Sequence, residues 1–233
     1  MNKTVVIHQP DFLSYLGFFH RLLHADQFIV LDHVQFVTGT SRSWMNRDKI
    51  KTPNGATWLT VSVEKCPRGT AINQVKLSNT VSWRENNLNL LKQHYVKAPY
   101  FNEIHPYVEK LYESECSTLV EFNMRSIHML CDLLNIEIDM VFSSDLECHG
   151  RKNDLLVEIL TQVKATHYLS GLGAKGYFDP LPFDKSGIEV VWQKFIHPVY
   201  PQLYGNFIEG LSTIDMLYNC GIESSRLILR ECL

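Results

Sequence analysis

Histidines, glycines and cationic side chains follow several apolar runs of this sequence. His8 ends the β-branched run Thr4–His8, and His20 lies a short distance further along the chain. Imidazole can carry a proton or contact a phosphate near neutral pH. A guanidinium or an ammonium group can hold negative charge as it develops in a reaction. These residue types predict proton transfer next to an anionic group, and we expect catalytic roles for His8, His20, Arg47 and Lys175.

The segment Ser170–Lys175 is rich in glycine and follows an apolar run. Its backbone N–H groups could cradle an anion, with Lys175 as a point charge. The spacing differs from that of a Walker A loop. Structural readings stay open as well: His8 could be a hydrogen-bonding strand end, Asp32 could cap the next segment, and Arg47 could lie on the surface.

A second set of residues is expected to bind a substrate or a nucleotide. Its members are polar, aromatic or glycine residues at predicted strand ends or in rigid proline-containing turns, where ligands of α/β proteins bind. They are Gln9, Phe12, Tyr15, Gly17, Asp32, Gln35, Asn46, Ser170, Gly171, Tyr177, His197, Tyr200 and Gln202.

Parallel strands would bring these residues together. Thr4–His8, Tyr15–His24 and Phe28–Asp32 have the pattern of a strand, a helix and a strand, which is typical of a βαβ unit. His167–Ser170 is predicted to be another parallel strand, and ligands bind outside the carboxyl ends of such strands. We therefore expect one cleft, with His8 near Gly171 and Lys175, formed by the segments 8–35, 44–47, 168–177 and 197–202.

The middle of the chain is predicted to be an insertion of strands at about 54–78 and helices at about 82–134. The strands are Trp58–Val63 and Ile72–Leu77, and Ser82 with Glu85 has the spacing of a capping box. The last third alternates again, with strands Met140–Ser143 and Glu189–Gln193 and helices Asp154–Val163 and Ile214–Cys220. The predicted fold class is α/β, with a Rossmann-like, mainly parallel sheet, a small antiparallel extension and a helical insertion. No repeat or linker divides it, so residues 1–233 are expected to form a single domain.

Composition and charge exclude several classes of protein. The net charge of −3 leaves no basic field for nucleic acid. The sequence has neither a signal peptide at its start nor an apolar run of the roughly 18 residues that span a membrane, so a cytoplasmic location is expected. The six cysteines are scattered, which predicts free thiols. Known metal-binding motifs are missing, and no metal site is expected.

The residues that open the chain resemble the WbqC-like protein family: His8-Gln9-Pro10, Tyr15-Leu16-Gly17-Phe18-Phe19-His20 and Leu31-Asp32-His33-Val34-Gln35-Phe36. The similarity covers nearly the whole chain and continues in Asn46-Arg47, Trp58-Leu59-Thr60-Val61, Ala98-Pro99-Tyr100-Phe101, Tyr168-Leu169-Ser170-Gly171 and His197-Pro198. It also includes Lys65, which the resemblance adds to the candidate binding residues. Family members usually carry proline where this chain has Ser14, a departure that affects the local turn.

The resemblance implies a role in bacterial surface-polysaccharide synthesis, including O-antigen and lipopolysaccharide. Some members are described as glycine or aminoacyl transferases that act on amino sugars. The implied activity is that of a transferase or amide-forming ligase that joins a small carboxylate, such as an amino acid, to an amine on a sugar nucleotide. Residues 4–32 also look like the opening of the HUP nucleotide-binding superfamily, which implies ATP with Mg²⁺ as cofactor. The histidine pair of that superfamily, two residues apart, is missing after Gly17, which puts nucleotide binding in question.

Two alternatives stay open. The acyl group could come from a preformed thioester or aminoacyl carrier, without ATP. A cysteine nucleophile is disfavoured there, because none of the six cysteines lies in the segments 8–35 or 168–202. The chain could also be a non-catalytic protein that binds a sugar nucleotide. Ionisable groups that meet in one pocket would favour an enzyme, and the candidates are His8, His20, Asp32, Arg47, Lys175 and His197.

Overall fold

The structure is a computed structural model that describes residues 2–37 and 44–232. Its centre is a parallel five-stranded sheet in the order β5-β2-β1-β6-β7. The strands are β1 (Thr4–His8), β2 (Gln27–Val30), β5 (Asp139–Phe142), β6 (His167–Ser170) and β7 (Glu189–Trp192). A separate antiparallel pair consists of β3 (Arg47–Thr52) and β4 (Gly55–Thr60). The Rossmann-like α/β fold class predicted from the sequence is confirmed.

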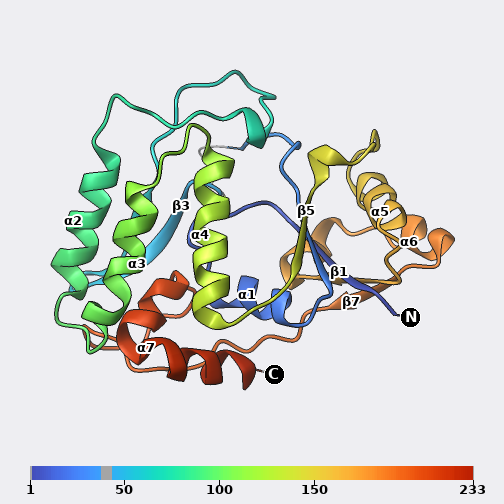
Figure 1. Cartoon of the computed structure of the whole chain (residues 1–233). Coiled ribbons are helices and arrows are strands. Elements are labelled where there is room, and N and C mark those ends of the chain that lie inside the picture. The colour runs from blue at the N-terminus through green and yellow to red at the C-terminus, as the bar shows by residue number, and fades with distance from the viewer. Residues whose placement is uncertain (1, 38–43, 233) are drawn as a thin grey trace.

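The strand order reverses between β1 and β6. The chain adds β2 and β5 on one side of β1, and then returns to add β6 and β7 on the other side. Helices therefore cover both faces of the sheet, as Figure 1 shows. In that view α5 (Asn153–Gln162) and α6 (Leu181–Ser186) lie on the right. The helices on the left are α2 (Trp83–Tyr95), α3 (Phe101–Glu113), α4 (Leu119–Leu134) and α7 (Thr213–Arg230).

The side chains of β1 point alternately into two apolar clusters. Val6 is fully buried in the larger cluster, which includes residues of α1 (Leu16–Leu23), α4 and α7. Val5 and Ile7 point the other way and pack with residues of α5 and α6. Successive side chains of a strand face opposite sides, so a strand covered on both faces becomes a continuous apolar run. The run Val5–Ile7 fits that rule, and His8 follows where β1 ends.

The chain between β2 and β5 contains the predicted insertion, with two differences in detail. Ile72–Leu77 was expected to be a strand, but Ile72–Gln74 is a short 3-10 helix, η1, followed by isolated bridges at Lys76 and Leu77. Ser82 makes no side-chain cap to α2. The capping box forms instead at α4, where the Thr118 hydroxyl accepts from the Glu121 N–H and the Glu121 carboxylate accepts from the Thr118 N–H.

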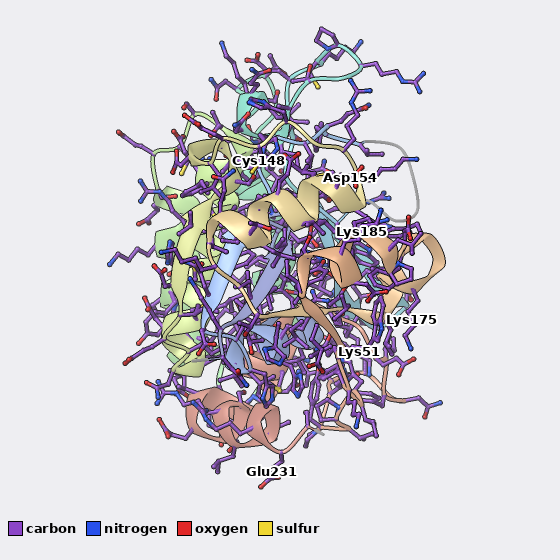
Figure 2. All side chains as sticks on the ribbon, turned by 90° about the vertical axis from the view of Figure 1, so that its right-hand side faces the viewer. Lys51, Cys148, Asp154, Lys175, Lys185 and Glu231 are labelled. Carbon is purple, nitrogen blue, oxygen red and sulfur yellow. The ribbon has the colours of Figure 1, made fainter. Side chains whose placement is uncertain are left out.

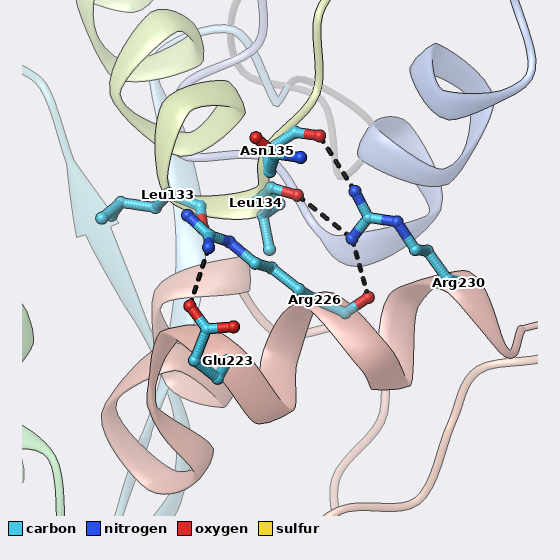
Figure 3. Close-up of polar contacts among 6 residues, drawn as sticks. All are labelled: Leu133, Leu134, Asn135, Glu223, Arg226 and Arg230. Atoms are coloured by element: carbon cyan, nitrogen blue, oxygen red, sulfur yellow. Dashed lines mark hydrogen bonds and ion pairs between the residues drawn. The ribbon is translucent and has the colours of Figure 1, made fainter.

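Helix α7 extends beyond the predicted closing helix and bends at Gly221. Gly221 has φ 75° and ψ 173°, a conformation open only to glycine, and an added Cβ would lie 2.5 Å from Cδ1 of Tyr100. The second half of α7 lies against the end of α4, where two guanidinium groups donate to the last carbonyls (Figure 3). Arg226 Nε donates to the Leu133 carbonyl at 2.9 Å, and Arg230 Nη2 donates to that of Asn135 at 2.9 Å. These donors satisfy carbonyls that lack a partner within α4.

Other boundaries differ from the sequence predictions by a few residues. β2 ends at Val30, so Asp32 lies beyond the strand. The 3-10 helix η3 (Leu172–Tyr177) and α6 separate β6 from β7, and neither was predicted. No helix among residues 2–37 and 44–232 is both long and apolar enough to cross a membrane. The six cysteines all fall within those ranges and are free thiols, as predicted.

Candidate functional site

A cleft of about 1220 Å³ opens where the carboxyl ends of β1 and β6 meet. His8 and Gln9 line it from the end of β1, and Ser170 and Gly171 line it from the end of β6. This position is the point at which the strand order reverses, where ligands of open α/β sheets bind. Its volume exceeds the several hundred cubic ångströms typical of a small-molecule site.

All four predicted segments contribute to this cleft. Besides the residues at the two strand ends, Tyr15 comes from the first segment, Trp44 from the second and Tyr177 from the third. His197 lines the cleft from the fourth segment. Its Nε2 is buried without a hydrogen-bond partner among the described residues. Segments far apart in the sequence therefore share one cleft, and the predicted site residues that line it are His8, Gln9, Tyr15, Ser170, Gly171, Tyr177 and His197.

His8 and Asp11 form a pair of titratable groups in the cleft. His8 Nδ1 lies 2.9 Å from the carbonyl oxygen of Gln9 and 3.7 Å from Oδ2 of Asp11. Because a carbonyl only accepts, the ring proton is on Nδ1, and Nε2 keeps its lone pair. The His8 side chain is 32% exposed within the cleft, and that of Asp11 is 13% exposed.

The surroundings shift the pKa values of both groups. Burial, followed by the positive charge of Arg21, lowers the pKa of His8 to about 3. Burial raises the pKa of Asp11 to about 7, and Arg21 opposes that rise. At neutral pH His8 is therefore an uncharged imidazole, while Asp11 exchanges its proton. A carboxyl group with a pKa near the working pH is suited to general acid or base catalysis.

The wall across from the sheet carries more ionisable and aromatic groups. Asp48, Lys49 and Trp44 line it from β3 and from the segment that leads into this strand. Asp48 is 2% exposed, and burial raises its pKa well above the usual range, with a further contribution from the charge of Asp11. The Lys49 ammonium lies 5.6 Å from the centre of the Trp44 ring. Among the described residues, the carboxyl groups of Asp11, Asp48 and Glu209 thus line the cleft together with aromatic and cationic side chains.

His20 does not line the cleft. It is buried, and its Nε2 donates to the carbonyl oxygen of Cys232 at 2.6 Å. Its Nδ1 accepts from the side-chain amide of Gln193 at 3.1 Å. Burial lowers the pKa of His20, and both nitrogens of the neutral ring have partners. This histidine joins α1 to the end of α7 and to Gln193, which is itself a cleft residue.

The two cations predicted to be catalytic also lie outside the cleft lining. Lys175 Nζ lies 5.3 Å from the centre of the Trp192 ring, and Figure 2 shows Lys175 at the edge of the molecule. The guanidinium of Arg47 lies 4.2 Å from the centre of the Trp58 ring. The guanidinium that does line the cleft is that of Arg21.

Asp32 and Asn46 make hydrogen bonds to other parts of the protein. The oxygens of Asp32 accept from Ser143, Ser144 and Asn73, which joins the end of β2 to the segment after β5. The Asn46 side chain donates to the carbonyl oxygen of Val61. Neither residue lines the cleft.

Phe12, Gly17, Gln35 and Lys65 lie outside the cleft lining as well. Phe12 is buried and stacks on Phe122, while Gln35 and Lys65 are exposed on the surface. An added Cβ at Gly17 would collide with the ring of Tyr15, so the close approach expected there is made by the protein itself.

Tyr200 and Gln202 belong to a buried polar network beside the cleft. The hydroxyls of Tyr95 and Tyr200 donate to the carboxylate of Asp215 at 2.6 and 2.9 Å. Gln202 Oε1 accepts from Lys51 Nζ at 3.0 Å. The network joins β3 and α2 to α7 and to the 197–202 segment, so these two residues hold elements together.

The sequence-based choice of residues missed Asp11, Arg21, Asp48 and Gln193. Asp11 lies three residues beyond the end of β1, within the segment already singled out, and Gln193 follows β7 directly. Their positions just beyond the carboxyl ends of strands were a usable signal. Arg21 lies next to His20 in an apolar helix, and only the packing distinguishes their roles. Among the described residues no group of three or more His, Cys, Asp or Glu could hold a metal ion.

A mainly parallel α/β sheet with a cleft at the reversal of its strand order defines a Rossmann-like protein with a switch-point site. Within that class, the chain belongs to the WbqC-like protein family, whose sequence profile matches residues 9–227. It is also similar to the uncharacterized protein Rv1507c of Mycobacterium tuberculosis (strain ATCC 25618 / H37Rv), with 32% identity over 232 residues. That match covers 99% of each chain. No solved structure matches the sequence.

Proposed function

We propose that the chain is a transferase that forms an amide by passing an acyl or aminoacyl group to an amine of a small molecule. Members of its family are associated with bacterial surface polysaccharides, so the proposed acceptor is an amino sugar carried on a nucleotide. The observation that carries the proposal is the pair of His8 and Asp11, 3.7 Å apart in the switch-point cleft. A protein that only recognises a ligand does not need a carboxyl group with a pKa of about 7 beside a neutral imidazole.

In the proposed reaction the acceptor nitrogen attacks the acyl carbonyl carbon, and a C–N bond forms. The bond from that carbon to its leaving group breaks, and the leaving group departs with the bonding electrons. The Asp11 carboxylate takes the proton that the nitrogen loses, and His8 Nε2 accepts a hydrogen bond from the substrate. Proton transfer of this kind contributes about 10²–10⁴-fold to a rate.

ATP is the proposed source of activation: an oxygen of the donor carboxylate would attack the α-phosphorus of ATP and displace pyrophosphate, and AMP is then the leaving group of the transfer. The cleft volume of about 1220 Å³ is large enough for a nucleotide together with an acceptor. A Mg²⁺ ion would enter with the nucleotide and be held mainly by its phosphates, as is usual for this ion. The rival donor is a preformed thioester. No cysteine is among the described residues that line the cleft, which supports direct transfer over a cysteine-bound intermediate.

The test is turnover with defined donors and acceptors. The protein is incubated with ATP, Mg²⁺, glycine or another small acid, and a 4-amino-sugar nucleotide, with thioester donors in a parallel series. Pyrophosphate release and the amide product, detected by mass spectrometry, are the readouts. Asp11→Asn should lose most of the activity, while Asp132→Asn, on the exposed surface of α4, should keep it. Wild-type turnover should rise as the pH passes through about 7, because Asp11 then becomes an available base.

Two results would reject the proposal. One is the absence of turnover and of pyrophosphate release with every donor. The other is an Asp11→Asn variant as active as the wild type, with an unchanged pH profile. Tight binding of the sugar nucleotide without any product would instead support a non-catalytic binding protein.

A further inference from the structure

Arg21 is a buried cation without a hydrogen-bond partner for two of its nitrogens. The residue is 5% exposed, and its Nε and Nη2 have no partner among the described residues. Among the described residues, no Asp or Glu carboxylate forms an ion pair with Arg21 within 4.0 Å. Removing a guanidinium from water without pairing it is unfavourable, so such groups are normally paired or face a ligand.

The position of Arg21 makes it accessible to a ligand in the cleft. It lines the cleft together with His8, Asp11 and Gly171. An added Cβ at Gly171 would collide with Arg21 Nη1, so the guanidinium lies directly against the backbone at the end of β6. The space that a side chain would take at residue 171 is therefore occupied by the guanidinium.

Gln193 is held beside the same guanidinium. Its side-chain amide donates to the Gly17 carbonyl at 2.8 Å and approaches His20 Nδ1 at 3.1 Å. With the nitrogen committed to these partners, Oε1 faces the Gly171 side and lies 4.0 Å from the position of an added Cβ there. Because Oε1 only accepts, it would take a hydrogen bond from an N–H or O–H of the ligand beside the group that Arg21 holds.

We infer that Arg21 is the receptor for an oxyanion of the substrate, a carboxylate or a phosphate group. A planar guanidinium presents pairs of parallel N–H donors that match two oxygens on one atom. The inference deepens the proposed function and rests on it only for the assignment of the cleft as the substrate site. In that function the oxyanion bound at Arg21 lies next to Asp11 and His8, so it orients the reacting group toward the base.

Binding of simple anions tests the inference without any turnover. The probes are inorganic phosphate and acetate, each compared with chloride at the same pH and ionic strength, and the readout is the thermal unfolding temperature. At least one of the two oxyanions should raise that temperature for the wild type, because a ligand that binds only the folded state stabilises it. A response to phosphate alone identifies a phosphate site, and a response to acetate alone identifies a carboxylate site.

Four variants locate the bound anion. Arg21→Met should lose the response, and Arg21→Lys, which keeps the charge but not the paired donors, should show less of it. Gly171→Ala should also weaken the response, because the added methyl group displaces the flexible end of Arg21. Gly176→Ala, in the same loop with nothing near its added Cβ, should respond like the wild type.

Stability without ligand separates this role from a structural one. Arg21→Met removes an unpaired buried charge, so its unfolding temperature in chloride should equal or exceed that of the wild type. A marked fall would show that Arg21 holds the fold together. No wild-type response to either oxyanion, or an undiminished response in Arg21→Met, would overturn the inference. Failure of the proposed reaction would look different, since Asp11→Asn should lose turnover and still bind the anion.

Discussion

Asp11 and Asp48 show how burial changes the chemistry of an ordinary carboxyl group. Both side chains sit in the wall of the cleft, and burial is the largest cause of the raised pKa of each. Asp11 lies near the cation of Arg21, which opposes the rise and leaves its pKa at about 7. At Asp48 a hydrogen bond from the Lys49 N–H at 2.6 Å opposes the rise, and its pKa stays well above the usual range. Asp11, with its pKa of about 7, titrates near neutral pH.

The raised pKa of Asp11 predicts a pH-dependent effect on stability. Its pKa is about 7 in the folded state and about 4 in an unfolded chain, so the folded state binds its proton more tightly. The contribution of Asp11 is therefore fully present below pH 4 and is lost as the pH rises toward 7, by about 1.4 kcal/mol for each pH unit. The side chain of the Asp11→Asn variant cannot ionise, so its free energy of unfolding in urea, relative to that of the wild type, should be larger at pH 8 than at pH 5. A difference in free energy that does not change with pH would contradict the raised pKa of Asp11, and Asp132→Asn is the control.

At the residue level, position along a strand was enough to predict which residues lie at the cleft. His8, Gln9, Ser170 and Gly171 were placed at strand ends by their order in the sequence, and they line the cleft. The choice between His20 and Arg21 could not be made in the same way. Both lie in one turn of α1, and only the packing of Gly171, Gln193 and Cys232 around them determines which one faces the cleft.

Among the secondary-structure elements, periodicity identified those with a regular apolar pattern. β1 and β6 were predicted with their observed bounds, because their apolar residues are continuous and end at polar ones. β3 was missed because its sequence, Arg-Asp-Lys-Ile-Lys-Thr, has the composition of a surface loop. Asp48 and Lys51 are nevertheless buried there. The ammonium of Lys51 has partners in Gln202 and in the Asn206 carbonyl, residues so distant in sequence that no local pattern reveals them.

The bend of α7 gives a prediction at the level of one helix. Gly221→Ala should lower the free energy of unfolding by about 1–3 kcal/mol, because alanine is strained at φ 75° and ψ 173°. Contact of its methyl group with the Tyr100 ring adds to this loss. Urea unfolding measures the change, with Gly176→Ala expected to stay within about 0.5 kcal/mol of the wild type. The double variant of Gly221→Ala and Tyr100→Ala removes the contact but keeps the backbone strain, so it should not recover all of the lost free energy of unfolding. Full recovery would show that the contact alone causes the loss.

At the scale of the whole molecule, the network around Asp215 links parts of the chain that are distant in sequence. Tyr95 comes from α2, Tyr200 from the segment before α7, and Asp215 from α7 itself. The Tyr95 hydroxyl also accepts from the Lys51 N–H of β3 at 2.9 Å. Asp215 is fully buried, so its carboxylate has no solvent to replace these partners.

Loss of Asp215 should therefore be far more damaging than loss of one of its donors. Asp215→Ala leaves two buried hydroxyls without an acceptor, at about 1–3 kcal/mol each, whereas Tyr200→Phe removes one hydrogen bond worth about 1 kcal/mol. Chemical denaturation of both variants and of the wild type measures the difference. Equal losses would show that the hydroxyls find other partners and that the network does not join these elements.

The separation of the small antiparallel sheet from the five-stranded sheet has an evolutionary consequence. His8, Asp11 and Arg21 belong to the first βαβ unit, whereas Trp44, Asp48 and Lys49 reach the cleft from β3 and the chain just before it. In the part of the chain that the structure describes, the β3–β4 hairpin pairs with no strand of the central sheet. Mutation, insertion or exchange of this hairpin can therefore reshape one wall while the groups on the other wall keep their scaffold. Related proteins could diversify the molecules they accept by this route and inherit the same chemistry.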